Sequence, residues 1–380
     1  MGVQLSISRQ KYNNFCKYAN FLSFFLHISL FFCNFAAKLA FMMKKITLFA
    51  LCAIVLFGCG SNNERLLTSA TGSIYECLVV GNGAPREAAA ATMGADMYGL
   101  PQMEAFFTVT QVQTNLFDDF LKSTRNILLL DINPHKYTQV KVLKSRDVWS
   151  KPQAMIRIQA PDDEAFIAYW EANGESVREW FVQEELARQI RFYRANTNKD
   201  ARAKLQKQGY DMLIPEDFVL VKSEELIVNS CSVNVLWCCN NKGPMRKDIV
   251  VMSYPYTAQE QFSNDSIIAM RNAVLGQIVS AQVPGSHMGT EYKHFPPVSR
   301  QVPALRDSVG GFYAVETRGL WKILDGEAMG GPFVSLTRLD QVNGRVVTAE
   351  TFLFAAGQKK RNALRQSEAI LYTLKMPNER

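Results

Sequence analysis

The sequence lacks the patterns on which familiar catalytic and cofactor sites depend. No Gly-x-Ser-x-Gly motif occurs, which excludes the usual nucleophile turn of an α/β-hydrolase. Gly81-Asn82-Gly83 follows an apolar run, but Arg86 stands where a dinucleotide-binding turn needs its third glycine. Histidine is also scarce, with four in 380 residues. We therefore expect no cofactor, and no catalytic residues can be assigned from the sequence.

Most of the chain also lacks an excess of either charge, although its formal net charge is +7 at pH 7. Residues 1–58 contain six of the 42 basic side chains and none of the 35 acidic ones, which leaves 36 basic against 35 acidic residues. Nucleic-acid binding needs a broad basic surface that neutralises phosphates. The balanced charge after residue 58 argues against a nucleic-acid partner.

The apolar run after Lys44-Lys45 is too short to span a bilayer. It covers the twelve residues Ile46 to Phe57, whereas a transmembrane helix needs about 20. Gly58 and Cys59 follow directly, and this order is typical of a bacterial lipoprotein signal peptide. Residues 42–58 are therefore predicted to be the signal peptide. Cys59 would become the first residue of the mature chain and carry the lipid, including palmitate.

Residues 1–41 admit two interpretations. Either translation starts at Met42 or Met43 and these residues are not translated, or they form an extra leader that inserts into the membrane. A signal peptide begins close to its apolar core, with positive charge immediately before it. Met43-Lys44-Lys45 fits this rule and Met1 does not, which favours the later start. Residues 59–70 are predicted to be a short lipidated tether.

Four cysteines follow Cys59, and their spacing does not suggest a disulfide framework: Cys77, Cys231, Cys238 and Cys239. If 231–239 is one strand, its ends lie roughly 26 Å apart at ~3.3 Å per residue, which is too far for a bridge. Neighbouring side chains in a strand point to opposite faces. Buried free thiols are the favoured interpretation.

The periodicity of apolar residues predicts a mixture of strands and helices. The opening, Ile74 to Ile132, is expected to be β-α-β-α-β, with its second helix at Leu116–Leu121. Three later stretches, which begin near Tyr137, Val233 and Phe333, each indicate two strands followed by an amphipathic helix. We therefore predict an α+β fold. In it, β-hairpin-plus-helix units form sheets with helices packed on one face, and the repeat allows a duplicated domain.

Two α+β domains are expected, covering residues 71–195 and 209–376. The polar and basic stretch from Asn196 to Gln208 is the predicted boundary between them. A second stretch, Pro284 to Asp307, is rich in proline and glycine and is expected to be a long irregular loop. Because such loops often carry function, a binding surface is expected there.

That stretch contains His287, Glu291 and His294. Two histidines and a carboxylate can bind zinc, and Ser286 beside His287 could indicate a hydrolase. The spacing within one loop is not diagnostic, so solvated histidines are favoured and no metal is expected. His287 remains a candidate ligand-binding residue.

Basic residues gather where the last helix is expected to begin: Lys359, Lys360 and Arg361, with Arg365 one turn further on. The helix macrodipole disfavours cations in the first turn by roughly 0.3–1 kcal/mol each. A departure from a local rule can mark a functional site. The cluster is therefore a candidate site for a phosphate, a carboxylate or a lipid head group. A solvated basic face paired with nearby acids is the favoured interpretation.

Glycines surround Trp321 in the sequence, with Gly319 before it and Gly330-Gly331 after it. Glycine beside a large aromatic residue allows either close backbone packing or a shallow pocket. Packing is favoured, because Gly330-Gly331 directly precedes an apolar strand. Arg318 and Trp321 are retained as candidate ligand-binding residues.

Several short segments are together distinctive. They are Gly99-Leu100-Pro101-Gln102, Arg125-Asn126-Ile127, Val148-Trp149-Ser150-Lys151-Pro152-Gln153, Tyr254-Pro255-Tyr256-Thr257, Arg318-Gly319-Leu320-Trp321, Met329-Gly330-Gly331-Pro332-Phe333-Val334-Ser335 and 364–374. Through them, about residues 72–376 resemble an uncharacterised Bacteroidetes lipoprotein family defined by a domain of unknown function. The resemblance implies a single-pass lipoprotein and no particular activity.

These observations predict a lipid-anchored protein of the cell envelope, facing the periplasm, whose role is binding or interaction without catalysis. Its expected partners are the membrane, through the N-terminal lipid, and an unknown envelope protein or small ligand. Two alternatives remain open. One is an envelope hydrolase that uses the 284–307 loop, and the other is a structural subunit of an envelope assembly.

Overall fold

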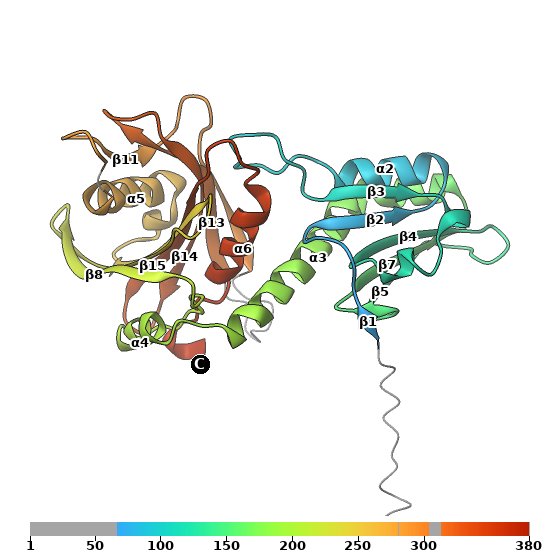
Figure 1. Cartoon of the computed structure of the whole chain (residues 1–380), viewed down its shortest axis with the longest axis horizontal. Helices are drawn as coiled ribbons and strands as arrows, with labels where there is room; N and C mark the ends of the chain where they lie inside the picture. Colours follow the sequence, from blue (N-terminus) through green and yellow to red (C-terminus); the bar gives the residue numbers. More distant parts are fainter. Residues whose placement is uncertain (1–66, 280, 304–312, 380) are drawn as a thin grey trace, which may run out of the picture. The chain divides into compact units, whose positions relative to one another are not determined.

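The computed structural model describes residues 67–279, 281–303 and 313–379 (Figure 1). The predicted leader, signal peptide and Cys59 lie outside the described residues. Of the predicted tether, residues 67–70 are described, and Thr68–Ser69 form strand β1, which pairs in parallel with β6 (Ser150–Lys151). Within the described ranges, no helix is both long and apolar enough to cross a membrane.

The N-terminal part is built on a five-stranded sheet with the order β3-β2-β4-β7-β5. Its strands are β2 (Glu76–Val80), β3 (Thr108–Val112), β4 (Asn126–Ile132), β5 (Lys141–Arg146) and β7 (Ala154–Ala160). Four of them run parallel, and β5 pairs antiparallel with β7. Val79 and Leu128 face one apolar cluster and Val80 and Ile127 face another, so the central strands are buried on both sides.

Two α-helices accompany this sheet, α2 (Gly83–Met93) and α3 (Asp163–Ala195). The Asp162 carboxylate accepts a hydrogen bond from the backbone N–H of Ala165 at 2.8 Å, which caps α3. The helix predicted over Leu116–Leu121 is wrong. Two 3-10 turns, η1 (Thr114–Leu116) and η2 (Leu121–Ser123), occupy this stretch instead.

The physical reason for that difference lies in the side chains of the stretch. Leu116 and Phe120 are 60% and 76% exposed. Phe117 and Leu121 pack against an apolar cluster, so only part of the expected apolar helix face would meet a core. The Asp118 carboxylate accepts a hydrogen bond from the backbone N–H of Leu121 at 2.9 Å, a local bond that competes with helix formation.

The C-terminal part contains an eight-stranded sheet in which every pairing is antiparallel. Its order is β11-β13-β14-β15-β10-β9-β8, and β12 also pairs with β13. The strands are β8 (Val219–Val228), β9 (Cys231–Asn240), β10 (Arg246–Pro255), β11 (His287–Thr290), β12 (Val298–Pro303), β13 (Tyr313–Leu324), β14 (Gly330–Asp340) and β15 (Arg345–Phe354).

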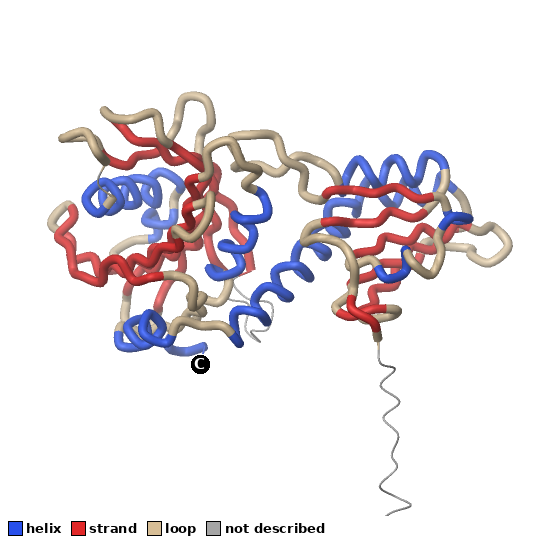
Figure 2. The backbone as a smooth tube through the Cα atoms, in the orientation of Figure 1, coloured by secondary structure: helices blue, strands red, loops and turns tan. Residues whose placement is uncertain are grey.

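Helices cover both faces of this sheet (Figures 1 and 2). Val251 of β10 belongs to the same apolar cluster as residues of α6 (Arg361–Leu371), whereas Val250 clusters with residues of α5 (Asn264–Ile278). Short 3-10 turns, η3 (Gln259–Phe262) and η4 (Pro377–Glu379), complete this part. The predicted α+β class is confirmed. Helices were expected on one face of each sheet, whereas here they lie on both faces. The reason is that strands with apolar side chains on both sides must be covered on both sides.

The stretch Pro284 to Asp307 was expected to be irregular, which holds for residues 284–286 and 291–297 and is wrong for the described residues between and after them. It contains β11 and β12, and both pair with β13. The twelve-residue β13 extends along both short strands, so their backbone groups find partners that the local sequence does not reveal. In the same sheet, Cys231–Asn240 forms one strand, which includes the strand expected from Val233, and the four cysteines described are free.

The stretch between the two predicted domains contains helix α4 (Lys199–Lys207). Ala201 and Leu205 of this helix are fully buried. The Asn198 side chain accepts hydrogen bonds from two backbone N–H groups of the first turn, and its own amide donates to the Phe218 carbonyl at 2.8 Å. The domain limits 71–195 and 209–376 stay a prediction.

We expect Gly331→Ala to lower the free energy of unfolding by about 3 kcal/mol, because overpacking forces atoms apart. A Cβ at this position would lie 2.0 Å from the Leu353 carbonyl oxygen. Urea unfolding of the purified variant measures the change. Gly276→Ala in α5 is the control, since its Cβ would come no closer than 3.4 Å to a neighbour. A Gly331→Ala protein as stable as the wild type would contradict this close approach.

Candidate functional site

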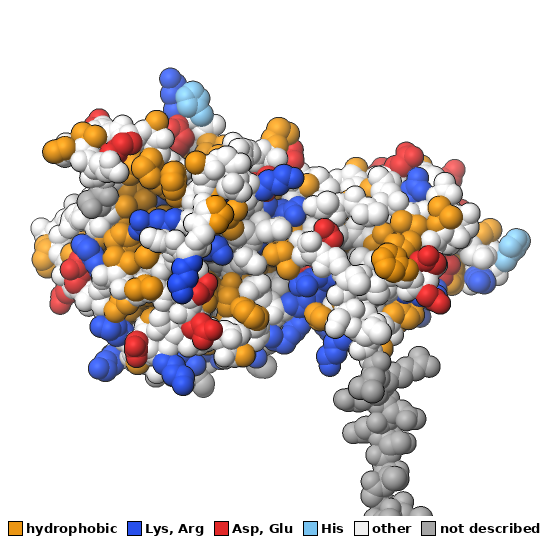
Figure 3. Space-filling model, viewed as in Figure 1, with side chains coloured by type: hydrophobic (Ala, Val, Ile, Leu, Met, Phe, Trp, Pro, Cys, Tyr) orange, Lys and Arg blue, Asp and Glu red, His pale blue; other side chains and the backbone are white. Residues whose placement is uncertain are grey.

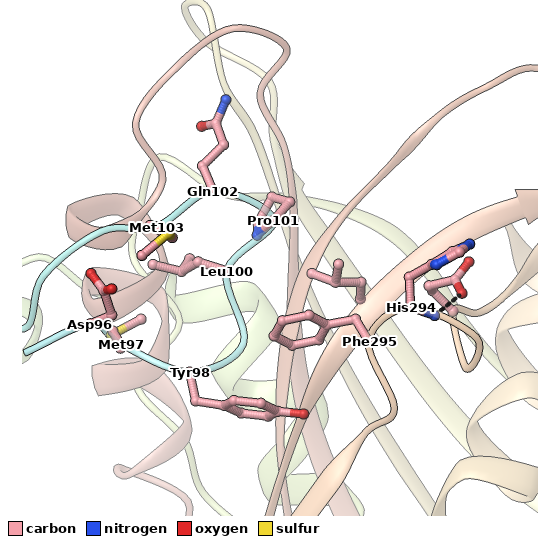
Figure 4. A pocket seen from close by; sticks show the side chains of 11 residues that line it. Asp96, Met97, Tyr98, Leu100, Pro101, Gln102, Met103, His294 and Phe295 are labelled. Atoms are coloured by element: carbon pink, nitrogen blue, oxygen red, sulfur yellow. Dashed lines mark hydrogen bonds between the residues drawn. The ribbon is translucent and has the colours of Figure 1, made fainter.

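The larger of two neighbouring cavities has a volume of about 590 Å³. One wall is the segment from Asp96 to Met103, and the other is formed by residues next to β11 and on β13. Most of its lining is apolar: Met97, Leu100, Pro101, Met103, Phe295 and Leu320. Asp96, Gln102, Glu291 and His294 add polar groups. Figure 4 shows the two walls facing each other.

An aromatic contact holds these walls together. The rings of Tyr98 and Phe295 stack with their centroids 4.7 Å apart, and the Tyr98 hydroxyl donates a hydrogen bond to the Pro296 carbonyl at 2.6 Å. Met103 is 86% exposed, so the cavity opens to solvent on its side. The site is therefore a preformed cleft with an apolar floor and an accessible entrance.

The Glu291 carboxylate at this cleft is already occupied. It accepts hydrogen bonds from Lys322 Nζ at 2.8 Å and from the backbone N–H groups of Lys293 and His294 at 2.7 and 3.0 Å. The bond from Lys322 is the largest of the effects that lower the pKa of Glu291 to about 2. A carboxylate that stays ionised down to such a pH is a weak base near neutrality.

The two loop histidines are not assembled into a catalytic or metal site with Glu291. His287 lies on β11 opposite Leu324, and its Nδ1 is 3.3 Å from the Gly285 carbonyl. The His294 ring points away from the segment 96–103 (Figure 4). Among the described residues, no group of three His, Cys, Asp or Glu side chains is placed to hold a metal ion.

A smaller cavity of about 190 Å³ adjoins the larger one, because Met97 and Tyr98 line both. Its other lining residues come from β12, β13, α6 and the chain before β3: Phe106, Val298, Arg300, Glu316, Arg318 and Arg365. Three arginines and a glutamate thus surround a small space whose rim is apolar. The structure brings together Arg318 and Arg365, which the sequence had marked for different reasons.

Glu316 is fully buried and accepts four hydrogen bonds, one of them from Arg318 Nη2 at 3.2 Å. Arg318 Nε donates at 2.8 Å, Arg300 Nε at 2.9 Å and the Tyr372 hydroxyl at 2.9 Å. Glu316 and Arg318 are two residues apart on β13, so their side chains share one face of the strand. Burial raises the pKa of Glu316, but Arg318 and Arg300 lower it by more than burial raises it. The pKa of Glu316 therefore lies well below its ordinary range.

Glu368 connects this strand to α6. It accepts hydrogen bonds from Arg318 Nη2 and, at 3.2 Å, from Arg365 Nη1. Burial alone would lower the pKa of Arg318, but Glu316 and Glu368 raise it above its usual value. Arg318 is therefore a permanent buried cation shared by two carboxylates on different elements. We call Arg300, Glu316, Arg318, Arg365 and Glu368 the arginine network.

The predicted basic cluster at the start of α6 has a local acid as its partner. The Glu104 carboxylate accepts the backbone N–H groups of Lys360 and Arg361 at 2.6 and 3.1 Å. An anion there satisfies free N–H groups and matches the positive end of the helix dipole. Arg361 Nη1 donates to the Ala105 carbonyl at 3.0 Å.

The side chains of this basic cluster differ in their exposure to solvent. Lys360, Arg361 and Arg365 are buried, whereas Lys359 is exposed. The three buried side chains therefore do not form a solvated basic face, and the favoured interpretation is wrong for them. Anion binding by the cluster as a whole stays a prediction.

Trp321 is packed and does not line either cavity. Its side chain is buried, and its Nε1 donates a hydrogen bond to the Leu353 carbonyl at 2.9 Å. Gly331 lies directly opposite on β14. The glycines around Trp321 thus serve close packing, which was the favoured interpretation.

Sequence reasoning missed the acids of this region, Glu104, Glu316 and Glu368. Two weak local signals were present. Glu316 stands two residues before Arg318 in an apolar strand, and Glu368 stands three residues after Arg365 in the last helix. Spacings of two in a strand and three in a helix place side chains on one face.

Comparison with known families finds two matches. Residues 196–373 match the model "Domain of unknown function (DUF4837)", and residues 70–194 match "Domain of unknown function (DUF8532)". These matches support membership of a family defined by domains of unknown function, which is the coarser part of the resemblance noted above. No curated protein matches the chain.

One solved structure with some likeness is the solution structure of cyanobacterial PsbP (CyanoP) from Synechocystis sp. PCC 6803. The sequence identity is 11%, and the TM-score is 0.28. The likeness covers 47% of this chain and 89% of that chain. A TM-score this low carries no argument about function.

We expect Glu316→Gln to lower the free energy of unfolding at pH 7 by about 4 kcal/mol, because a buried guanidinium loses a charged partner. Since the pKa of Glu316 is lowered in the folded state, its stabilising effect is present above about pH 4.3, the value for an unfolded chain. The effect is lost as the pH falls below that value. The difference in the free energy of unfolding between variant and wild type should therefore become smaller at acidic pH.

Urea unfolding at pH 7 and at pH 3 measures this difference. Glu171→Gln is the matched control, because Glu171 is an exposed residue of α3, and its effect should be below about 0.5 kcal/mol. An unchanged stability of Glu316→Gln at pH 7 would show that the buried pair is not formed.

Proposed function

We propose that this chain is a lipid-anchored protein of the cell envelope, facing the periplasm, which binds a small ligand without catalysing a reaction. The observation that carries the proposal is the larger cavity. Sites for small molecules are preformed clefts of about 300–1,000 Å³ with an apolar lining and a few polar groups. The cavity of about 590 Å³ between the segment 96–103 and Phe295 fits this description.

Binding is favoured over hydrolysis by the state of the polar groups. Glu291 is held by Lys322, and its low pKa makes it a poor general base. His294 points away from the apolar wall, and His287 does not line the cavity. A hydrolase needs a nucleophile or a metal within reach of a base, and these residues do not supply that geometry.

Anchoring by lipid is supported by the sequence before the fold. A basic pair, a short apolar core and Gly58-Cys59 follow in the order of a lipoprotein signal peptide. Strand β1 begins at Thr68, nine residues after Cys59. A tether of this length would hold the folded chain close to the membrane surface. The resemblance to Bacteroidetes lipoproteins supports the same placement.

An assembly subunit is the second candidate, and strand β8 is the observation that favours it. β8 is the last strand of the sheet, and its Val219 and Ile227 are 62% and 69% exposed. Edge strands can pair with another chain. However, Lys222, Glu224 and Glu225 interrupt this edge with charge, which opposes such pairing. The surface in Figure 3 likewise intersperses basic, acidic and hydrophobic side chains.

Ligand binding can be tested with Met103→Asp, which places a charge at the open apolar rim. We expect a small molecule or lipid from fractionated envelope extract to raise the melting temperature of the wild type and to remain bound in native mass spectra. The variant should bind that species about tenfold more weakly, since a carboxylate there must be desolvated. Val342→Asp is the control, because Val342 is also exposed but does not line the cavity. Stabilisation by the protein fraction alone would favour the assembly candidate.

Lipid anchoring predicts that Cys59→Ser moves the protein out of the membrane fraction and abolishes its labelling with palmitate. Cell fractionation and metabolic labelling measure the two effects. Cys231→Ser is the control, because Cys231 is a free cysteine within the fold. Equal labelling of Cys59→Ser and wild type would disprove the anchor.

A further inference from the structure

We propose that the smaller cavity binds the anionic group of an amphipathic ligand, whose apolar part occupies the larger cavity. The inference rests on the proposed binding function and adds the chemistry of the ligand. It depends on three features of the described residues: buried arginine donors, the balance of charge, and the continuity of the two cavities.

Two arginines at the smaller cavity have buried N–H groups without an acceptor. Arg318 Nη1 and Arg365 Nε form no hydrogen bond within the described residues. The two residues are 7% and 3% exposed, and both line the cavity. Buried polar groups are nearly always paired in proteins, so these two donors call for an acceptor that the described residues do not supply. Guanidinium groups match the oxygens of carboxylates and phosphates especially well.

The charges of the arginine network do not balance. Arg300, Arg318 and Arg365 bring three positive charges, whereas Glu316 and Glu368 bring two negative ones. The lowered pKa of Glu316 keeps it ionised, so the surplus amounts to one positive charge at neutral pH. A surplus cation beside a cavity favours an anion over a neutral ligand. The Arg300 side chain is 57% exposed and gives the network a solvent-facing member.

The two cavities together have the form of an amphipathic site. At about 190 Å³, the smaller one is below the range for a whole small-molecule ligand, so it serves as a subsite. Met97 and Tyr98 form a wall common to both spaces. A ligand whose anionic group lies among the arginines would thus place its apolar part along Tyr98, towards Leu100 and Phe295.

The test compares three probes with the same alkyl chain: octanoate, octyl phosphate and octanol. Equilibrium dialysis of the full-length protein in nanodiscs measures their dissociation constants, with empty nanodiscs as the blank. We expect at least one anionic probe to bind at least tenfold more tightly than octanol. The better of octanoate and octyl phosphate identifies the group as a carboxylate or a phosphate.

Arg300→Gln tests the arginine network without removing a buried charge. This substitution should weaken the binding of the anionic probe about three- to tenfold and leave the binding of octanol unchanged. Arg146→Gln is the matched control, because Arg146 is also an exposed partner of a glutamate but does not line either cavity. Met103→Asp should weaken the binding of all three probes, since it alters the space for the alkyl chain.

The outcomes separate this inference from the proposed function. Equal binding of octanol and the anions would overturn the anionic subsite and would leave apolar binding in the larger cavity intact. An anion preference that Arg300→Gln and Arg146→Gln reduce equally would also overturn it. If none of the probes binds above the blank, the amphipathic ligand is excluded, and the extract screen with Met103→Asp decides the proposed function.

Discussion

The guanidinium of Arg318 is shared by two buried carboxylates, and the C-terminal part of the structure depends on this interaction. Glu316 comes from the same strand, β13, whereas Glu368 comes from α6. Removing such charges from water is costly, and the cost is offset only when each group is well paired. The network therefore fixes how α6 lies against the sheet. Tyr372 adds a further hydrogen bond to Glu316 just beyond the helix.

The same constraint shapes the candidate site. Arg318 and Arg365 are held beside the glutamates that they bind. Because Glu316 itself lines the smaller cavity, the two arginines line it as well. Residues 96–106 close its other side, and Glu104 joins that segment to the first turn of α6. Stability and ligand chemistry thus arise from one set of charges. The apolar cleft next to it is held by the stacked rings of Tyr98 and Phe295, which adds a surface suited to a hydrocarbon group.

Local patterns predicted the fold best where burial repeats with a regular period. The β10 segment was recognised as a strand because its run is continuously apolar, and the end of the chain as a helix because its apolar residues recur at helical spacing. The prediction at Leu116–Leu121 was wrong because only Phe117 and Leu121 pack on a core there, and Asp118 forms a local hydrogen bond that competes with a helix. The stretch containing β11 and β12 was expected to be irregular, because its strands are defined by their pairing with β13 and carry weak patterns of their own.

For the site, the sequence identified Arg318 and Arg365 without indicating that they meet. It did not identify the acids that hold them, since Arg318 and Glu368 are 50 positions apart. The sequence by itself determined the α+β class, a strand that begins near Val233 and the charge balance after residue 58, because these follow from composition and from periods of two and 3.6 residues. Only the tertiary structure decided which charges are buried together and where the cavities lie. Desolvation and pairing depend on distances between elements, which local sequence does not encode.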